Sequence, residues 1–343
     1  MNFELFNPQH GAPNPSNALA RYPQLADFYS HLGNTPLIPV PSPHGGAKIL
    51  AKCEYENPFG SVKDRAAFGM FCDAIDRHDP DRGPLKLLDA SGGNMGKALA
   101  MMCHLCDIPV HLVIPDSSPQ ALVDILEQHN ARITKVDHQY FLLGLIAKAQ
   151  EIAQQEPGWT LLSQHLNLVN VAVHQHQTGK EIRRQLHGLT ANGWVAAVGT
   201  GGTLSGVYAA LSEDNPQVKV QGTTPAELPF GTMAPPDGRN KFAGAGGMGF
   251  GFRQPFITRM KVLDIPFYPV SWQESLSAMF EFYKLTGMKI GSSSAANWQS
   301  AYHLAATMGP EETVITLFAD AGSDADRLQG EEFFNCSRPI HTC

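Results

Sequence analysis

The 343-residue sequence predicts an α/β protein with mostly parallel sheets, and two observations carry this prediction. Short apolar stretches typical of strands alternate with stretches of helical periodicity, which is the order expected of parallel α/β folds. Turns of small residues also stand directly before several helical stretches, at Ser91–Gly96, Gly199–Thr203 and Gly291–Ala296. Such turns present backbone N–H groups to an anion at the start of a helix.

The expected elements follow one another in a regular order after an N-terminal arm. Residues 1–30 are rich in Pro and Asn and predict little regular structure beyond a helix near Leu25–Leu32. Apolar runs predict seven strands: Ile49–Cys53, Leu85–Ala90, Val110–Ile114, Arg132–Val136, Trp194–Val198, Lys219–Thr223 and Thr313–Phe318. Helical patterns lie between them, among them Val62–Asp76, Pro119–Gln128, Leu142–Gln155, Thr178–Gln185 and Gln273–Leu285. The stretch Pro225–Arg239, with four prolines and two glycines, is either a lid loop or a surface insertion.

The composition is that of an ordinary globular protein and excludes several classes of function. A net charge of −7 leaves no basic surplus for binding nucleic acid. No apolar run has the length of a membrane span, and the N-terminus lacks a secretory signal, so we expect a cytoplasmic protein. The six cysteines are too few for a disulfide framework. We expect no metal site, because Cys103 and Cys106 suit buried, reduced thiols of a helix better than metal ligands.

A lysine at the start of the first long helix is the first candidate for catalysis. The segment Asn57–Arg65 reads Asn-Pro-Phe-Gly-Ser-Val-Lys-Asp-Arg, so Ser61 is a candidate N-cap and Lys63 falls in the first helical turn. The partial positive charge at this end of a helix disfavours an ammonium group and lowers the pKa of the amine. A neutral amine suits bond formation with a carbonyl cofactor, although most lysines are solvated surface charges.

Taken together, the lysine segment and the three small-residue turns resemble the cysteine synthase and cystathionine β-synthase family. These are fold-type II enzymes that use pyridoxal 5′-phosphate. The resemblance runs from about Gly33–Leu37 to about Gly322, with the motifs in the family's order and spacing. It implies a tryptophan synthase β-like architecture, with a smaller domain at 48–160, a larger domain from 1–47 plus 161–343, and an active site in the cleft between them. It also implies a homodimer.

The resemblance assigns the contacts of the cofactor residue by residue. Lys63 matches the lysine that forms the Schiff base and then moves the α-proton. Asn94 matches an asparagine on the ring oxygen, although Gly93-Asn94 also suits an Asx turn. Ser293 matches the serine opposite the pyridine nitrogen, where a hydroxyl makes a weaker electron sink than a carboxylate; an N-capping turn is the alternative. The phosphate cradle corresponds to Gly199, Thr200, Gly201, Gly202 and Thr203.

The substrate's α-carboxylate is expected at the turn after the Leu85–Ala90 strand. The resemblance places it on Ser91, Gly92, Gly93 and Met95, and Gln164 matches a glutamine that contacts the same carboxylate. A helix start suits a carboxylate, because its N–H groups carry partial positive charge. The polar residues that follow keep the family's spacing and are expected to support the site or the fold: Asn167, Asn170, His174, Thr178, Gly179 and Glu181.

The sequence departs from the family's pattern at three places. Gly92 and Met95 replace hydroxyl residues, and the segments Gly222–Pro225 and Ala319–Gly322 differ from the usual motifs. We interpret these changes as leaving the cofactor's contacts intact and altering the substrate side. They favour a specialised donor or nucleophile.

The resemblance implies β-replacement on an activated L-serine, either O-acetyl-L-serine or O-phospho-L-serine, through an α-aminoacrylate. Sulfide would give cysteine, whereas an amine nucleophile would give a precursor of 2,3-diaminopropionate. One alternative is a serine or threonine dehydratase with the same cofactor. Another is a catalytically silent paralogue that binds the cofactor, although Lys63, Asn94 and Ser293 are all present. The sequence leaves the donor and the nucleophile open.

Overall fold

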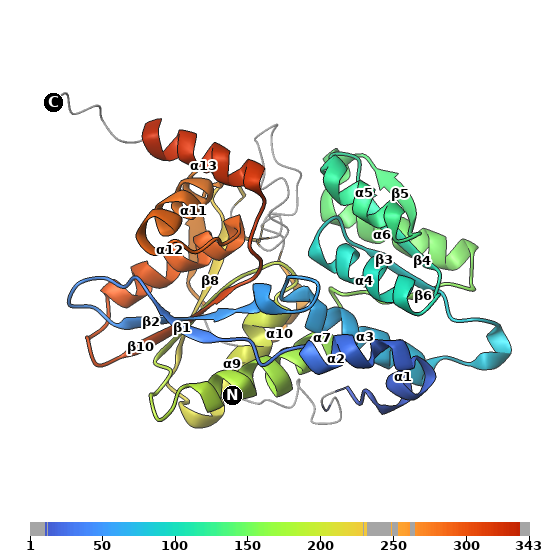
Figure 1. Ribbon diagram of the computed structural model, residues 1–343, viewed down its shortest axis with the longest axis horizontal. Helices are drawn as coiled ribbons and strands as arrows, with labels where there is room; N and C mark the ends of the chain where they lie inside the picture. Colours follow the sequence, from blue (N-terminus) through green and yellow to red (C-terminus); the bar gives the residue numbers. More distant parts are fainter. Residues whose placement is uncertain are drawn as a thin grey trace.

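The structure, a computed structural model, contains two β-sheets that lie in two lobes side by side (Figure 1). It describes the following residues: 11, 13–228, 230, 231, 248, 253–260 and 265–336. Strands of each sheet are linked through helices, and most strand pairs are parallel, which confirms the predicted α/β class. The stretch Pro225–Arg239 lies outside the described residues, apart from 225–228, 230 and 231.

The larger sheet has six strands in the order β1-β2-β10-β7-β8-β9. Only the β1–β2 pair is antiparallel. The strands are β1 (Leu37–Val40), β2 (Lys48–Cys53), β7 (Gly193–Ala197), β8 (Lys219–Pro225), β9 (Phe267–Val270) and β10 (Thr313–Phe318). The sheet therefore joins the N-terminal and C-terminal parts of the chain, with β10 between β2 and β7.

Helices cover both faces of the larger sheet. Alternate residues of a strand point to opposite sides, so each strand contributes side chains to both of these contacts. In β10, Val314 and Phe318 pack against α11 (Trp272–Thr286) and α12 (Ser292–Ala306). Ile315 and Leu317 pack on the other face, against α9 (Gly202–Asp214). This burial on both faces explains why the strand is a continuous apolar run.

The smaller sheet has four parallel strands in the order β5-β4-β3-β6. They are β3 (Leu87–Ala90), β4 (Val110–Pro115), β5 (Arg132–Val136) and β6 (Thr160–Leu161). One face packs on α3 (Lys63–Arg77), α4 (Asn94–Leu105) and α5 (Gln120–Gln128), and the other on α6 (Phe141–Gln155). The predicted boundary at residue 48 puts β2 in the smaller domain, whereas β2 pairs within the larger sheet.

The remaining described elements are short, apart from the last helix. The α-helices are α1 (Ser16–Arg21), α2 (Ala26–His31), α7 (Val169–Val173), α8 (Lys180–Gln185), α10 (Pro255–Arg259) and α13 (Asp324–Cys336). The 3₁₀ turns are η2 (Pro23–Leu25), η3 (Glu54–Glu56), η4 (Pro80–Arg82) and η5 (His138–Tyr140). A π-helical segment, η6 (His174–Gly179), precedes α8, where the sequence predicted an ordinary α-helix from Thr178.

Candidate active site

The candidate residues gather where the parallel strands of both sheets end, which is the usual position of sites in α/β folds. Lys63 is the first residue of α3, and the N–H of Val62 before it donates to the Ala319 carbonyl after β10 at 2.9 Å. The predicted N-cap was wrong by one residue, because Val62 takes that position. The Ser61 hydroxyl still accepts the Lys63 N–H at 3.2 Å.

A buried ionic network anchors the first turn of α3, which begins with Lys63. Arg65 donates to both carboxylate oxygens of Glu54 and of Glu181, with nitrogen–oxygen distances of 2.7 to 2.8 Å. The Lys52 ammonium donates to Glu181 at 2.8 Å. Burial alone would raise the pKa of Glu181, but these two cations hold it at about 2. Sequence analysis missed Arg65 and Glu54 and treated Glu181 as a supporting residue.

The environment of Lys63 favours its neutral amine. Burial lowers the pKa of this amine, while the carboxylates of Asp320 and Asp64 act in the opposite direction. Burial also raises the pKa of Asp320. Both half-buried groups therefore shift toward their neutral forms, and a larger fraction of Lys63 than of a surface lysine is free to act as a nucleophile or proton acceptor.

Asn94 is held by Asp320 across the boundary between the two lobes. The Asn94 amide, at the start of α4, donates to Asp320 Oδ2 at 2.6 Å. The hydroxyl of Ser294, in the first turn of α12, donates to the Asp320 carbonyl at 3.0 Å. Ser293 is next to it and 1% exposed. The change at Ala319–Gly322 was expected to affect only the substrate side, but Asp320 contacts Asn94, a residue assigned to the cofactor.

The predicted phosphate cradle has a shape that suits an anion. Gly201 is the N-cap of α9, with a φ of +85°, and offers no side-chain cap, so among the described residues the N–H groups that follow Gly202 in the first turn are left for a ligand. The turn is also crowded: a Cβ on Gly202 would lie 2.5 Å from Asn170 Oδ1. The Thr200 hydroxyl accepts from the Gly202 N–H at 3.2 Å. These features fit a bound phosphate group.

A hydrogen-bonded link connects this turn to the predicted substrate side. The Asn170 amide donates to the Gln164 carbonyl at 2.9 Å and to Thr200 Oγ1 at 3.0 Å. The Gln164 side chain donates to the Ala90 carbonyl at 2.8 Å, directly before Ser91. Among the predicted substrate residues, Ser91 closes the turn by accepting the Gly96 N–H at 3.0 Å. A shift in either turn therefore reaches the other through Asn170.

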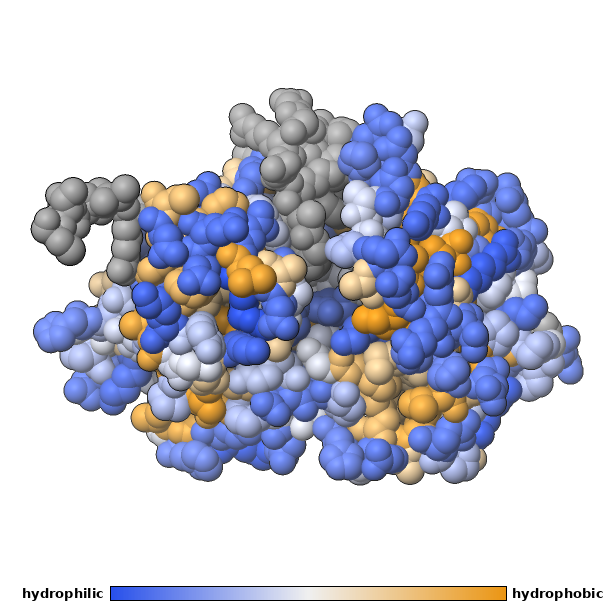
Figure 2. Space-filling model, turned by 45° about the horizontal axis from the view of Figure 1, so that its top comes forward, coloured by the Kyte–Doolittle hydropathy of each residue, from blue (hydrophilic) through white to orange (hydrophobic). Residues whose placement is uncertain are grey.

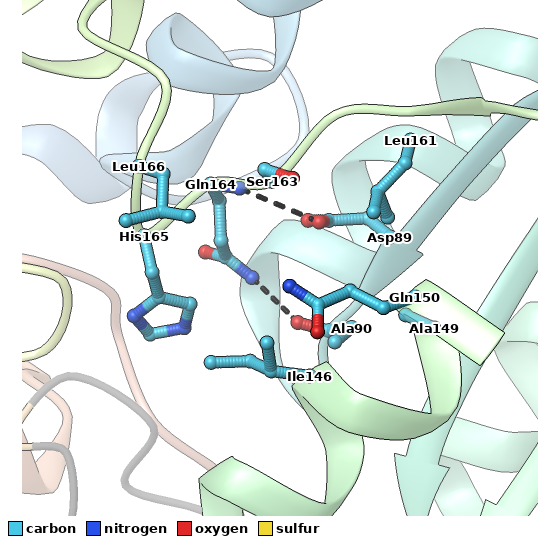
Figure 3. A pocket seen from close by; sticks show the side chains of 10 residues that line it. All are labelled: Asp89, Ala90, Ile146, Ala149, Gln150, Leu161, Ser163, Gln164, His165 and Leu166. Carbon is cyan, nitrogen blue, oxygen red and sulfur yellow. Dashed lines mark hydrogen bonds between the residues drawn. The ribbon is translucent and has the colours of Figure 1, made fainter. Parts of the chain in front are cut away.

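A pocket opens beside Gln164, between the end of β3, α6 and the segment 161–166 (Figure 3). Asp89 contributes a buried carboxyl group whose Oδ1 accepts the Gln164 N–H at 3.4 Å. Its Oδ2 has no partner among the described residues, and burial raises the pKa of Asp89 to about 7. The space-filling view shows the surface hollowed between the two lobes (Figure 2).

His165 is a second residue of this pocket that sequence analysis missed. Its Nδ1 lies 2.9 Å from Oε1 of Gln254, a residue 1% exposed just before α10. Burial lowers the pKa of His165 to about 4, and the charge of Lys63 adds to this effect. The imidazole is therefore neutral at physiological pH. His165 and Gln254 are 89 positions apart in the sequence, and no short pattern links them. The signal that could have pointed to His165 was its neighbour Gln164, which was already a predicted substrate residue.

Two further findings concern metals and membranes. Asp116, Asp137 and His138 place ligand atoms within 4.8 Å of one another near the surface. An acidic surface cluster of this kind is common without a bound ion. Among the residues that the structure describes, no helix combines the length and apolar character needed to cross a membrane.

Comparison with known proteins agrees with this geometry. Residues 29–320 match the family described as "Pyridoxal-phosphate dependent enzyme". The chain is 31% identical to cysteine synthase B of Campylobacter jejuni, over 88% of this chain and 96% of the relative. It is 30% identical to a probable cysteine synthase of Bacillus subtilis, over 87% and 95%. The structure of an O-acetylserine dependent cystathionine β-synthase from Helicobacter pylori superposes with a TM-score of 0.76 at 26% identity, over 92% and 98% of the two chains.

Proposed function

Since the chain belongs to the pyridoxal-phosphate dependent enzymes, within the cysteine synthase-like β-replacement family, we propose that it replaces the β-substituent of an activated L-serine. One observation supports this proposal most directly. Lys63, Asn94 and the uncapped start of α9 converge at the ends of the parallel strands. They match the amine, amide and anion cradle that pyridoxal phosphate requires.

Each residue has a proposed role toward the cofactor and the substrate. Lys63 would hold the cofactor through its amine, and Asn94 and Ser293 would orient the ring. Gly199, Thr200, Gly201, Gly202 and Thr203 would bind its phosphate. When bound, pyridoxal phosphate supplies an electron sink for the substrate's α-carbon. Ser91, Gly92, Gly93, Met95 and Gln164 would bind the α-carboxylate.

The lowered pKa of Lys63 defines its part in the reaction. With a substrate bound, the neutral amine of Lys63 could accept the proton at the substrate's α-carbon without first losing one of its own. Asp320 stabilises the protonated lysine that results, because its charge favours the ammonium form.

We propose O-acetyl-L-serine as the donor, ahead of O-phospho-L-serine. Among the described residues that line the pocket beside Gln164 there is no lysine or arginine, and the one acidic residue is Asp89. A phosphate dianion in this pocket would have no cationic partner among these residues and would be repelled by an ionised Asp89, whereas an acetyl group carries no charge. The Helicobacter protein described as O-acetylserine dependent supports the same choice.

The test uses purified protein loaded with pyridoxal phosphate. Acetate and phosphate release from the two donors would be measured, together with the cofactor's absorption and the products formed with sulfide. We expect acetate release and a changed spectrum with O-acetyl-L-serine, and loss of both in Lys63→Ala. Lys135→Ala, which removes an exposed lysine on β5, is the control. Ammonia and keto acid from unmodified serine would instead show a dehydratase, and full activity in Lys63→Ala would refute the assignment. Sedimentation would test the predicted homodimer.

A further inference from the structure

The contact between His165 and Gln254 favours the tautomer that leaves one ring nitrogen free. The amide oxygen of Gln254 can only accept a hydrogen bond, so the Nδ1 that faces it at 2.9 Å carries the hydrogen. Nε2 then presents a lone pair. In the part of the chain that the structure describes, Nε2 has no hydrogen-bond partner. The ring is half-buried and lines the pocket beside Gln164.

The ring lies beside a residue that is predicted to bind the substrate's α-carboxylate. The close-up shows the Gln164 amide turned toward Ala90 and the His165 ring beside it, on the side away from Asp89 (Figure 3). The ring is also near enough to Lys63 for the lysine's charge to lower the pKa of His165. The same pocket therefore contains Gln164, which is predicted to bind the substrate's α-carboxylate, and Nε2 of His165, an acceptor with no partner among the described residues.

We propose that His165 selects the nucleophile, by accepting a hydrogen bond at Nε2 from an N–H or O–H group of a neutral nitrogen or oxygen nucleophile. This inference rests on the proposed β-replacement and names its second substrate by chemical class. Hydrosulfide is an anion and a weak donor, so a lone pair gives it no favourable contact. A neutral azole or amine has the N–H that the lone pair requires.

Two observations support a neutral ligand over an anionic one. Asp89 lies in the same pocket with a carboxylate oxygen that has no partner among the described residues, and the described part of the lining contains no cationic side chain. With the substrate's α-carboxylate already bound at Gln164, an anionic nucleophile would meet repulsion from that carboxylate and from any ionised Asp89. The imidazole itself accepts a hydrogen bond without taking the proton, because a pKa of about 4 makes it a weak base at neutral pH.

The test separates the two halves of the reaction. Acetate release from O-acetyl-L-serine reports the first half, and product formed with 1,2,4-triazole or with sulfide reports the second. His165→Phe keeps a ring without the acceptor, and His165→Asn keeps an acceptor. We expect His165→Phe to lower kcat/KM for triazole about three- to tenfold, the worth of one neutral hydrogen bond, with sulfide and acetate release unchanged. His165→Asn should retain most of the triazole rate.

Several possible results would overturn this inference. An equal fall for both nucleophiles in His165→Phe would show a structural role and overturn the inference. No fall for triazole, or the same fall in His165→Asn as in His165→Phe, would also overturn it. If the wild-type protein released no acetate, the proposed function would fail first and the selector role with it.

Discussion

A methyl group at Gly202 tests whether the turn before α9 is built to hold a phosphate group. The added Cβ would lie 2.5 Å from Oδ1 and 2.7 Å from Cγ of Asn170, well inside contact distance. Asn170 is 2% exposed and cannot move away without breaking its hydrogen bonds to Gln164 and Thr200. Overpacking of this kind costs about 1–3 kcal/mol. Each lost hydrogen bond adds about 1 kcal/mol.

Gly202→Ala should therefore lower the free energy of unfolding by about 3–5 kcal/mol in the cofactor-free protein, measured in urea. It should also raise the Kd for pyridoxal phosphate about tenfold or more, because Thr200 loses its support from Asn170. Titration with pyridoxal, which has no phosphate, should show a much smaller change. Gly158→Ala is the matched control, since nothing lies within 4 Å of a Cβ there. Equal weakening of both ligands in Gly202→Ala would refute the cradle.

Three further outcomes follow from the buried charges. Arg65→Met should cost about 3–5 kcal/mol in urea unfolding, because it leaves two buried glutamates without their main partner; a loss under 1 kcal/mol would contradict this. Asp320→Asn removes a charge that raises the pKa of Lys63. The pH midpoint for chemical modification of the Lys63 amine in cofactor-free protein should therefore fall, and a rise in this midpoint would contradict the prediction. Burial raises the pKa of Asp89 from 3.8 to about 7, so its ionisation destabilises the fold as pH rises through this range. Asp89→Asn should recover up to about 4 kcal/mol at pH 8 and flatten the dependence of stability on pH between 4 and 8; an unchanged slope would exclude this role.

The strands that the sequence predicted and those it missed differ in their place in the sheet. β4 and β10 are buried on both faces, so their apolar runs are continuous and match the prediction within one residue. The three missed strands, β1, β6 and β9, all lie at sheet edges. β1 and β9 each contain a proline, which weakens a strand pattern but is tolerated at an edge. β6 has only two residues and gives no period to detect.

The site was predictable where the signal is local and not where it depends on the fold. The turn before α9 was recognised because small residues and a helix start stand next to each other in the sequence. By contrast, Asp320 and Asn94 are 226 residues apart, and His165 and Gln254 are 89 apart. Such contacts follow from which strand ends meet, and no short pattern encodes that.

The central place of β10 has a consequence for synthesis of the chain. All strands of the smaller sheet lie within residues 87–161, so this sheet can pair as soon as that stretch has left the ribosome. The larger sheet cannot, because β2 and β7 must wait for β10, which comes last among the strands. At ordinary rates of translation the delay is tens of seconds. During that time β2 and β7 present unpaired edges, which are templates for aggregation. We therefore expect chaperones to bind the nascent chain mainly at the strands of the larger sheet.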